Sequence, residues 1–427
     1  MDGGEGTTIP KDQQKAIQFF SQAAQQGHAA ALTKMGTFHE AGVYGFKRDL
    51  NEALRYYTLA AEKGDVLAHT AIGDIYSHAQ QHQGGGESEG GGVVPKRDLR
   101  RAIESYSAAA EAGHVPALHQ LALIYAVGDV AGGVERNVVK AVALYQRAAN
   151  LGDPHALWVV GTMLCAGDLG VVPKDEAKGR EFFERAASQG HPPSQHALGV
   201  CWRDGVGGVV DVKKALKLLK ASAKNGYPPA RTTLGMMFLE GVRQREGGGE
   251  GGEGGEGGEE VVVVPKNVHG GIALLEEAVD QGDPDSMTQL GMVYATGMHL
   301  EGPQTQQATT NKSRAFSLFQ SAVSKGEGHP LAHLFLGSLY EEGDNTLHPR
   351  VERNCERALY HYGKAAAQGL REGQYRLGLL YESGKESIAM DTRLACYWLA
   401  QAAAQGHPDA QSRLDTLLSS SPPSEAG

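Results

Sequence analysis

Small and apolar residues recur along the chain in two alternating patterns, each the length of a short helix. The first pattern places a small residue, a glycine five residues later and an aromatic residue three residues beyond that glycine, as in Ala68, Gly73 and Tyr76. These positions fall on one side of an α-helix, so the pattern predicts a helix, which we call helix A. Its ten copies carry, at the central position, Gly36, Gly73, Ala122, Gly161, Gly199, Gly235, Gly291, Gly337, Gly378 and Asp415.

The second pattern, which we call helix B, carries an apolar pair between small residues and closes with a glycine, as in Tyr56 and Tyr57 followed by Gly64. Small residues let two helix backbones approach closely, and we expect the apolar pair to fill the space between adjacent helix pairs. Glycine adopts the left-handed conformation that ends a helix, so it predicts the end of each helix B. These terminal glycines are Gly27, Gly64, Gly113, Gly152, Gly190, Gly226, Gly282, Gly326, Gly369 and Gly406.

Neighbouring terminal glycines stand 36 to 56 residues apart. Self-similarity at such a period is typical of a solenoid, in which each repeat contacts only its neighbours. The 427 residues therefore predict one long domain rather than two or three globular ones. We expect the helical repeats to cover residues 10–418, with a disordered start at 1–9 and a disordered tail at 419–427.

Three long insertions, at residues 79–94, 243–264 and 298–312, fall in the same place, the loop from helix A to helix B. One loop position maps to one edge of a solenoid, so the insertions are expected along one rim. Flexible loops of this length are tolerated because closure entropy grows slowly with length. We interpret the Gly/Glu-rich tracts as low-complexity segments without function; a weak acidic contact surface is the alternative.

The two ends of the array differ. The first predicted element is a helix B without a helix A to pair with, so it is either a cap or a start within a longer array, and we favour the second. The last element, AQSRLDTLLSS, is a helix A whose central position is Asp415. Polar residues follow it, which is typical of a C-terminal cap.

Composition and charge exclude several classes of function. The net charge of −10 and the absence of a dense Lys/Arg run argue against a nucleic-acid binder. The start lacks the basic and apolar regions of a secretory signal, and no stretch approaches the roughly 20 apolar residues that span a bilayer. We therefore expect a cytoplasmic protein without direct membrane insertion. Four cysteines at no repeated spacing indicate no disulfide framework.

The two patterns together resemble the Sel-one-like repeat (SLR) family, a relative of the tetratricopeptide repeat. AALTKMGTFHEAG and SQHALGVCWRDG match the first half of its repeat, and KAVALYQRAANLG and RALYHYGKAAAQG match the second half. The resemblance covers about residues 10–418. It implies an all-α fold, a right-handed α-solenoid of about ten antiparallel helix pairs, and a role as an adaptor that binds other proteins.

Helix A lines the concave face in tetratricopeptide arrays, and the residue three before its central position points into the groove. By this analogy His119, Trp158 and His196 face the groove in three consecutive repeats. A tryptophan flanked by histidines is suited to hold an apolar or aromatic side chain of an extended peptide. The alternative is that Trp158 packs between helices.

Charged residues gather near the ends of the helices A. Arg203 and Asp204 complete the predicted peptide-binding set. An acidic excess at such ends predicts a neutral or basic partner segment, because complementary charge sets orientation and association rate. The acidic residues are Glu40, Glu240, Glu341, Glu342 and Glu382.

The sequence contains no nucleophile elbow, HExxH motif or phosphate-binding loop, so we expect no catalytic residues and no cofactor. Of its 17 histidines, His28, His114, His191 and His407 directly follow a terminal glycine, which indicates a turn position, and no metal site is predicted. Some cysteine-rich bacterial members of the resembled family are linked to β-lactam binding or hydrolysis. A hydrolase of that kind is the alternative to a non-catalytic scaffold, although this chain lacks the cysteine pair in each repeat.

Overall fold

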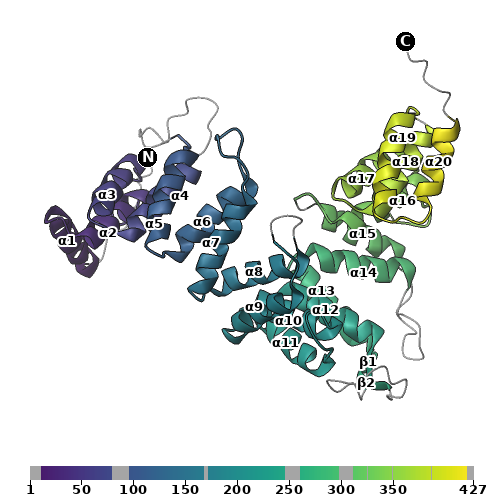
Figure 1. Cartoon of the computed structure of the whole chain (residues 1–427), viewed down its shortest axis with the longest axis horizontal. Helices are drawn as coiled ribbons and strands as arrows, with labels where there is room; N and C mark the ends of the chain where they lie inside the picture. Colours follow the sequence, from purple (N-terminus) through teal and green to yellow (C-terminus); the bar gives the residue numbers. More distant parts are fainter. Residues whose placement is uncertain are drawn as a thin grey trace, which may run out of the picture. The chain divides into compact units, whose positions relative to one another are not determined.

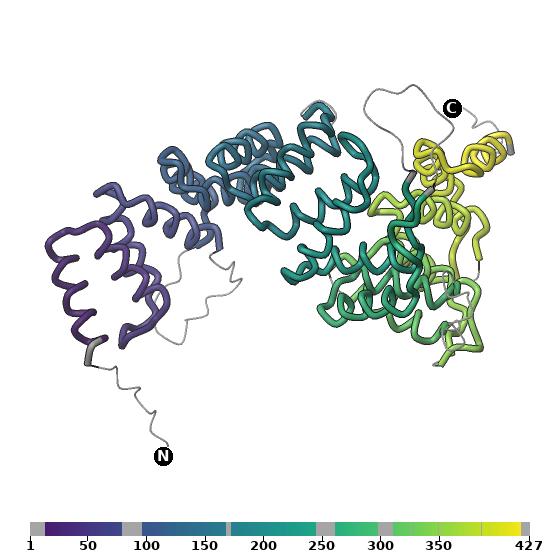
Figure 2. Tube along the Cα trace, turned by 90° about the horizontal axis from the view of Figure 1, so that it is seen from below, coloured from purple at the N-terminus to yellow at the C-terminus, as the bar shows by residue number. Residues whose placement is uncertain are grey.

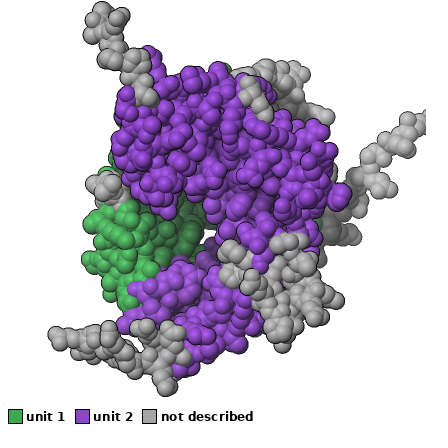
Figure 3. Space-filling view, turned by 90° about the vertical axis from the view of Figure 1, so that its right-hand side faces the viewer, with its two compact units in different colours: residues 1–194, 206–208 green, residues 195–205, 209–427 purple. Residues whose placement is uncertain are grey.

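The computed structural model describes residues 11–78, 96–167, 172–245, 260–297, 311–324, 326–348, 350–385 and 387–420. Over these residues the chain forms twenty helices and one two-stranded sheet, as Figure 1 shows. The chain divides into two compact units, one of residues 1–194 with 206–208 and one of residues 195–205 with 209–427 (Figure 3).

Helices of the two predicted types alternate along the chain (Figure 2). Helices A are α2 (Ala29–Ala41), α4 (Val66–His78), α6 (Val115–Val127), α8 (Pro154–Ala166), α10 (Pro192–Asp204), α12 (Pro228–Glu240), α14 (Pro284–Thr296), α16 (Pro330–Glu342), α18 (Arg371–Ser383) and α20 (Ala410–Ser420). Helices B are α1 (Lys11–Gln25), α3 (Leu50–Glu62), α5 (Leu99–Glu111), α7 (Val138–Asn150), α9 (Glu176–Ser188), α11 (Val212–Lys224), α13 (Val268–Asp280), α15 (Lys312–Val323), α17 (Cys355–Ala367) and α19 (Thr392–Ala404). The predicted α-solenoid of helix pairs is confirmed.

Every helix B ends at its predicted glycine. The ten terminal glycines have φ between 58° and 87°, in the left-handed region that favours glycine. At Gly64 the backbone N–H donates to Ala61 O at 2.8 Å, and the following Asp65 N–H donates to Ala60 O at 3.0 Å. This pair of bonds is the Schellman motif, which satisfies the last carbonyls of the helix. The chain is thereby turned into the next helix A.

Each helix B after α1 begins at a capping side chain that also joins it to the preceding helix A. Asp175 accepts from Lys178 N at 3.0 Å, and its own N–H donates to Leu164 O at 2.8 Å at the end of α8. Such a cap stabilises a helix by about 1 kcal/mol. The same arrangement recurs at Asp49, Asp98, Asn137, Asp211, Asn267, Asn311, Asn354 and Asp391.

The central glycine of helix A packs against the second residue of the apolar pair on helix B. A Cβ placed on Gly36 would lie 2.6 Å from the ring of Tyr57, and one on Gly291 would lie 2.7 Å from the ring of Phe319. In such a pair the two helices approach this closely because the glycine has no side chain. This corrects one expectation, because the second residue of the pair lies inside its own helix pair and not between adjacent pairs.

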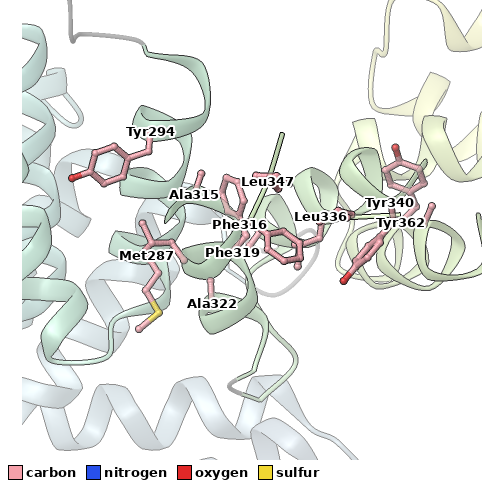
Figure 4. Close-up of a cluster of buried hydrophobic side chains, with 14 of the residues drawn as sticks. Met287, Tyr294, Ala315, Phe316, Phe319, Ala322, Leu336, Tyr340, Leu347 and Tyr362 are labelled. Atoms are coloured by element: carbon pink, nitrogen blue, oxygen red, sulfur yellow. The ribbon is translucent and has the colours of Figure 1, made fainter. Parts of the chain in front are cut away.

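Buried clusters follow these contacts within each unit. In the first unit, Tyr57 of α3 and Tyr106 of α5 are each at most 2% exposed. In the second unit, Met287 of α14, Phe319 of α15 and Leu336 of α16 belong to one continuous cluster (Figure 4). Since each ring joins only neighbouring helices, the core runs along the repeats instead of gathering at one centre.

One insertion departs from the all-helical expectation. Residues at both ends of the predicted 243–264 loop form β1 (Val242–Arg245) and β2 (Glu260–Val264), which pair antiparallel. The valine run of β2 favours a strand because β-branched side chains pack well on a pleated surface. Val264 is 1% exposed and packs with the core of α11 and α12. The loop prediction was therefore wrong at its ends, whereas residues 246–259 lie outside the described part.

The other predicted boundaries fall only partly within the described residues. The predicted start at 1–9 and the loop at 79–94 lie outside the described residues. The predicted loop at 298–312 ends earlier, because Asn311 caps α15 and Lys312 begins it. Helix α20 reaches Ser420, two residues into the predicted tail, and residues 421–427 are not described.

A matched pair of glycine substitutions tests the packing between helices A and B. A Cβ on Gly337 would lie 2.5 Å from the buried ring of Tyr362, whereas one on Gly363 of α17 meets nothing within 4 Å. We expect Gly337→Ala to lower the free energy of unfolding by about 1–3 kcal/mol through overpacking. Gly363→Ala should raise it by about 0.5–1 kcal/mol, because alanine favours the helix. Urea denaturation followed by circular dichroism measures both; equal stability of the two variants would contradict the account.

Candidate functional site

Four rings from consecutive helices A form a continuous row in the first unit, which we call the ring cluster: His119, His155, Trp158 and His191. The His119 ring lies 5.1 Å from that of His155, which lies 5.6 Å from that of Trp158. The His191 ring is 6.2 Å from His155 and 6.5 Å from Trp158. These distances are those of aromatic rings in contact.

The repeat positions these rings. His119 of α6 and Trp158 of α8 each stand three residues before the central position of their helix, as the sequence indicated. His155 lies one turn before Trp158, and His191 directly precedes α10, where its Nδ1 lies 2.8 Å from Ser194 Oγ. His191 thus holds the turn position expected of it and also contacts the tryptophan. Stacking of helices A brings rings from different repeats together.

The ring cluster is accessible on one side. The His155 side chain is exposed, and Trp158 is half-buried. Among the described residues the indole N–H of Trp158 has no acceptor, and it is not buried. The cluster therefore presents an aromatic surface with an unused donor, which suits a ligand that offers an apolar group beside a hydrogen-bond acceptor.

Among the described residues, the Asp153 carboxylate borders the cluster. Asp153 Oδ2 lies 3.0 Å from His119 Nε2 and accepts from Ala156 N at 2.7 Å, which caps α8. Burial lowers the pKa of His119, and the Asp153 charge opposes that effect. Burial, with the His155 charge, also lowers the pKa of His191. Because these two rings favour the neutral form, the cluster near neutral pH presents aromatic rings beside the Asp153 carboxylate.

The other predicted residues lie in the second unit. His196 Nε2 is 2.9 Å from Thr233 Oγ1, and its ring is 5.5 Å from that of Tyr227. The Arg203 guanidinium donates to both carboxylate oxygens of Asp204, at 2.6 and 2.7 Å. The structure therefore brings Trp158 together with His155 and His191, which sequence reasoning missed.

Two of the acidic residues expected to face a partner instead accept a hydrogen bond from a buried tyrosine. Glu40 accepts from the hydroxyl of Tyr57 at 2.6 Å, and Glu341 accepts from the hydroxyl of Tyr362 at 3.0 Å. Each carboxylate therefore joins helix A to the buried tyrosine of its own helix B. Because these two carboxylates already accept hydrogen bonds within the fold, they indicate the charge of a partner less clearly than the sequence suggested.

No group of three or more His, Cys, Asp or Glu side chains among the described residues could hold a metal ion. His196 and Thr233 illustrate why: a hydroxyl and a neighbouring ring satisfy the imidazole without a metal. Within the same residues, no helix has the length and apolar character needed to cross a bilayer.

His196 predicts a measurable pH dependence of stability. The Thr233 hydroxyl donates to Pro229 O at 3.0 Å, so the Nε2–H of His196 donates to that hydroxyl. Burial, aided by the charge of Arg203, lowers the pKa of His196 to about 4. His196 therefore binds a proton less readily in the folded state than in the unfolded state. Its contribution to the free energy of unfolding is complete above pH 6.5 and is lost as the pH falls towards 4.

We expect His196→Gln to reduce the fall in unfolding free energy between pH 7 and pH 4 by on the order of 3 kcal/mol. Urea denaturation across this pH range measures the effect. His269→Gln is the matched control, because it makes the same substitution at an exposed position of α13 and should leave the profile close to that of the wild type. A wild-type profile in His196→Gln would refute the assignment.

Comparison with known families finds the Sel1 repeat along most of the chain. The matched segments are residues 3–28, 29–65, 84–114, 115–153, 154–191, 192–227, 256–283, 284–327, 330–370 and 371–407. They follow the alternation of helices A and B described above.

Individual relatives agree with this match. The chain is 27% identical over 259 residues to chitin synthase regulatory factor 3 of Schizosaccharomyces pombe. The aligned segment covers 58% of this chain and 24% of the relative. It is 29% identical over 254 residues to DAP3-binding cell death enhancer 1 of Rattus norvegicus. Here the aligned segment covers 60% of this chain and 43% of the relative. The chain therefore spans less than half the length of these curated relatives.

A solved structure shares the fold over nearly the whole chain. It is a protective antigen of uropathogenic Escherichia coli strains with an SLR fold, at 25% identity and a TM-score of 0.58, covering 97% of this chain and 77% of that one. Ten repeat matches, the helix alternation and this likeness lead to one conclusion: the chain belongs to the Sel1 repeat family.

Proposed function

We propose that the protein is a non-catalytic scaffold that binds partner proteins on the concave face lined by its helices A. The ring cluster carries this proposal. Trp158 occupies a position at which the repeat requires no aromatic residue, yet its ring lies in contact with those of His155 and His191. Aromatic anchors that are partly exposed and rigidly held are typical of binding hot spots.

The chemistry of the cluster indicates the partner segment. Its flat aromatic surface suits an apolar or aromatic side chain of an extended peptide, while the Trp158 indole can donate to a peptide carbonyl. Asp153 beside it, and the net charge of −10, favour a neutral or basic segment. His196, Arg203 and Asp204 extend the proposal to the second unit, where they remain predicted peptide contacts.

The compartment and the relatives support the same role. No disulfide joins the four cysteines, which suits a reducing compartment, and we propose that the protein acts in the cytoplasm. Two relatives are named as a regulatory factor and as a protein that binds another, which fits a scaffold. The hydrolase alternative has no comparable support, because the chain lacks the cysteine pair per repeat that marks the β-lactam-binding members.

Panning a random peptide library on the purified full chain tests the proposal. We expect enriched peptides to contain an aromatic or large apolar residue and to bind the double variant His155→Ala, Trp158→Ala at least about tenfold more weakly, since anchor side chains carry most of the binding energy. Fluorescence polarisation measures the affinities, and circular dichroism verifies folding.

The matched control is Tyr397→Ala, which removes an aromatic ring that is 53% exposed on α19, outside the ring cluster. It should bind the same peptides with wild-type affinity. Equal affinity of the double variant and the wild type would sink the proposal, and turnover of a chromogenic β-lactam that a point mutation abolishes would replace it with an enzyme.

A further inference from the structure

Two consecutive helices A carry no charged side chain. Among the helices of the described residues, only α6 and α8 lack Asp, Glu, Lys and Arg altogether. A helix that is apolar on most of its sides is usually buried. On α6, however, Leu123 is 52% exposed and Val127 is 69% exposed. Two large apolar side chains of this helix are therefore in contact with solvent.

The packing of the repeats does not require these two residues. Four other helices A carry an apolar residue at the position of Leu123, but there it is half-buried. Val127 stands five residues after the central position, where the other nine helices A carry a small, polar or charged residue. Those nine residues are Ala41, His78, Ala166, Asp204, Glu240, Thr296, Glu342, Ser383 and Ser420. The exposed apolar surface is therefore a property of this repeat and not of the family of helices.

Leu123 and Val127 extend the ring cluster along α6. With His119 they follow one another at intervals of four residues, so the three lie on one side of the helix, about 6 Å apart along its axis. We call these three residues the α6 row. The His119 ring, at the start of the row, lies 5.1 Å from that of His155. The α6 row and the ring cluster are thus continuous.

We propose that the α6 row binds the continuation of the partner peptide that the ring cluster holds, and that this segment is extended, uncharged and apolar at every second residue. The inference rests on the proposed function. Residues on the same side of an extended chain are about 6.7 Å apart, close to the steps of about 6 Å along the row. An aromatic residue at the ring cluster is thus joined to apolar residues two and four positions away, opposite Leu123 and Val127.

Charge determines which segments fit. Asp153 borders the start of the row, where its Oδ2 lies 3.0 Å from His119 Nε2. Neither α6 nor α8 offers a Lys or Arg side chain to an acidic residue of the peptide. A charged side chain placed against Leu123 and Val127 would leave water without gaining a partner, which is unfavourable. The row therefore selects for uncharged residues, and against acidic ones most strongly.

An extended chain fits the row better than a helix does. Helices of this chain approach one another through small residues, such as Gly161 of α8, where a Cβ would lie 2.7 Å from the Phe183 ring. The α6 row presents an imidazole ring and two branched side chains instead. A second helix therefore cannot approach as closely, whereas a single extended strand needs no such groove.

Two peptides of equal length and composition test the spacing. The first carries tryptophan, leucine and valine at alternate positions among serines, and the second carries the same three residues four positions apart. We expect the full chain to bind the alternating peptide about tenfold or more tightly, as measured by fluorescence polarisation. Equal binding would overturn the proposal, and so would tighter binding of the second peptide, which would indicate a helix.

A pair of substitutions locates the binding. Val127→Glu places a charge in the α6 row and should weaken binding of the alternating peptide by about tenfold or more. Val139→Glu is the matched control, because it introduces the same charge at a valine of α7 that is 64% exposed and outside the row. It should bind the peptide as the wild type does. Circular dichroism verifies folding, and a folded Val127→Glu variant with wild-type affinity would contradict the proposal.

An exchange of charges tests the register. A peptide with glutamate in place of its valine should bind the wild type weakly and the Val127→Lys variant at least about tenfold more tightly. A peptide with glutamate in place of its leucine should gain less, because that residue lies one helical turn away, opposite Leu123. Equal gains for the two peptides, or none, would refute the register.

Two further measurements separate this inference from the proposed function. Library peptides that depend on Trp158 should also lose affinity for Leu123→Glu. Dependence on Trp158 alone rejects the α6 row and leaves the proposed function standing, whereas dependence on neither rejects both. Self-association in analytical ultracentrifugation that Val127→Glu abolishes would assign the row to a second copy of the chain and overturn the inference.

Discussion

The close approach of a glycine on helix A to a ring or leucine on helix B determines how each repeat is built. At Gly36, Gly73, Gly161, Gly291 and Gly337 the opposing aromatic ring occupies the space in which a Cβ would lie, 2.5–2.7 Å from the nearest ring carbon. Two helices at this separation bury the ring almost completely and leave little freedom in their register. The terminal glycine and the capping Asp or Asn then set where the next helix begins.

Much of the fold could be predicted from sequence because these constraints are local. Some positions require glycine, either because φ is positive, as at Gly64, or because an aromatic ring occupies the space of a Cβ, as at Gly337. Such glycines recur at a fixed spacing in the sequence. The β1–β2 hairpin could not be predicted in this way, because a glutamate-rich glycine tract separates the valines of β2 from their partner strand in the sequence. Its pairing depends on Val264 reaching the core of neighbouring helices.

The candidate site was predictable only in part. Trp158 stood out because the repeat does not require an aromatic residue at its position. His155 and His191 did not, since one lies a turn earlier on the same helix and the other holds a turn position that four histidines share. Their role depends on how helices A stack, which brings three rings within 6.5 Å of one another. Residues at the packing positions thus determine the fold, whereas residues at the other positions of helix A are available to contact a partner.

The central claim is that each contact between a central glycine and the opposing ring or leucine stabilises its own helix pair. Its loss should affect only the neighbouring helices. Hydrogen exchange of Gly291→Ala, read by mass spectrometry, tests it most directly, because the added Cβ would lie 2.7 Å from the Phe319 ring. The account predicts faster exchange in α14 and α15 and unchanged exchange in α2 to α7. Exchange that accelerates equally in all helices, or in none, would contradict it.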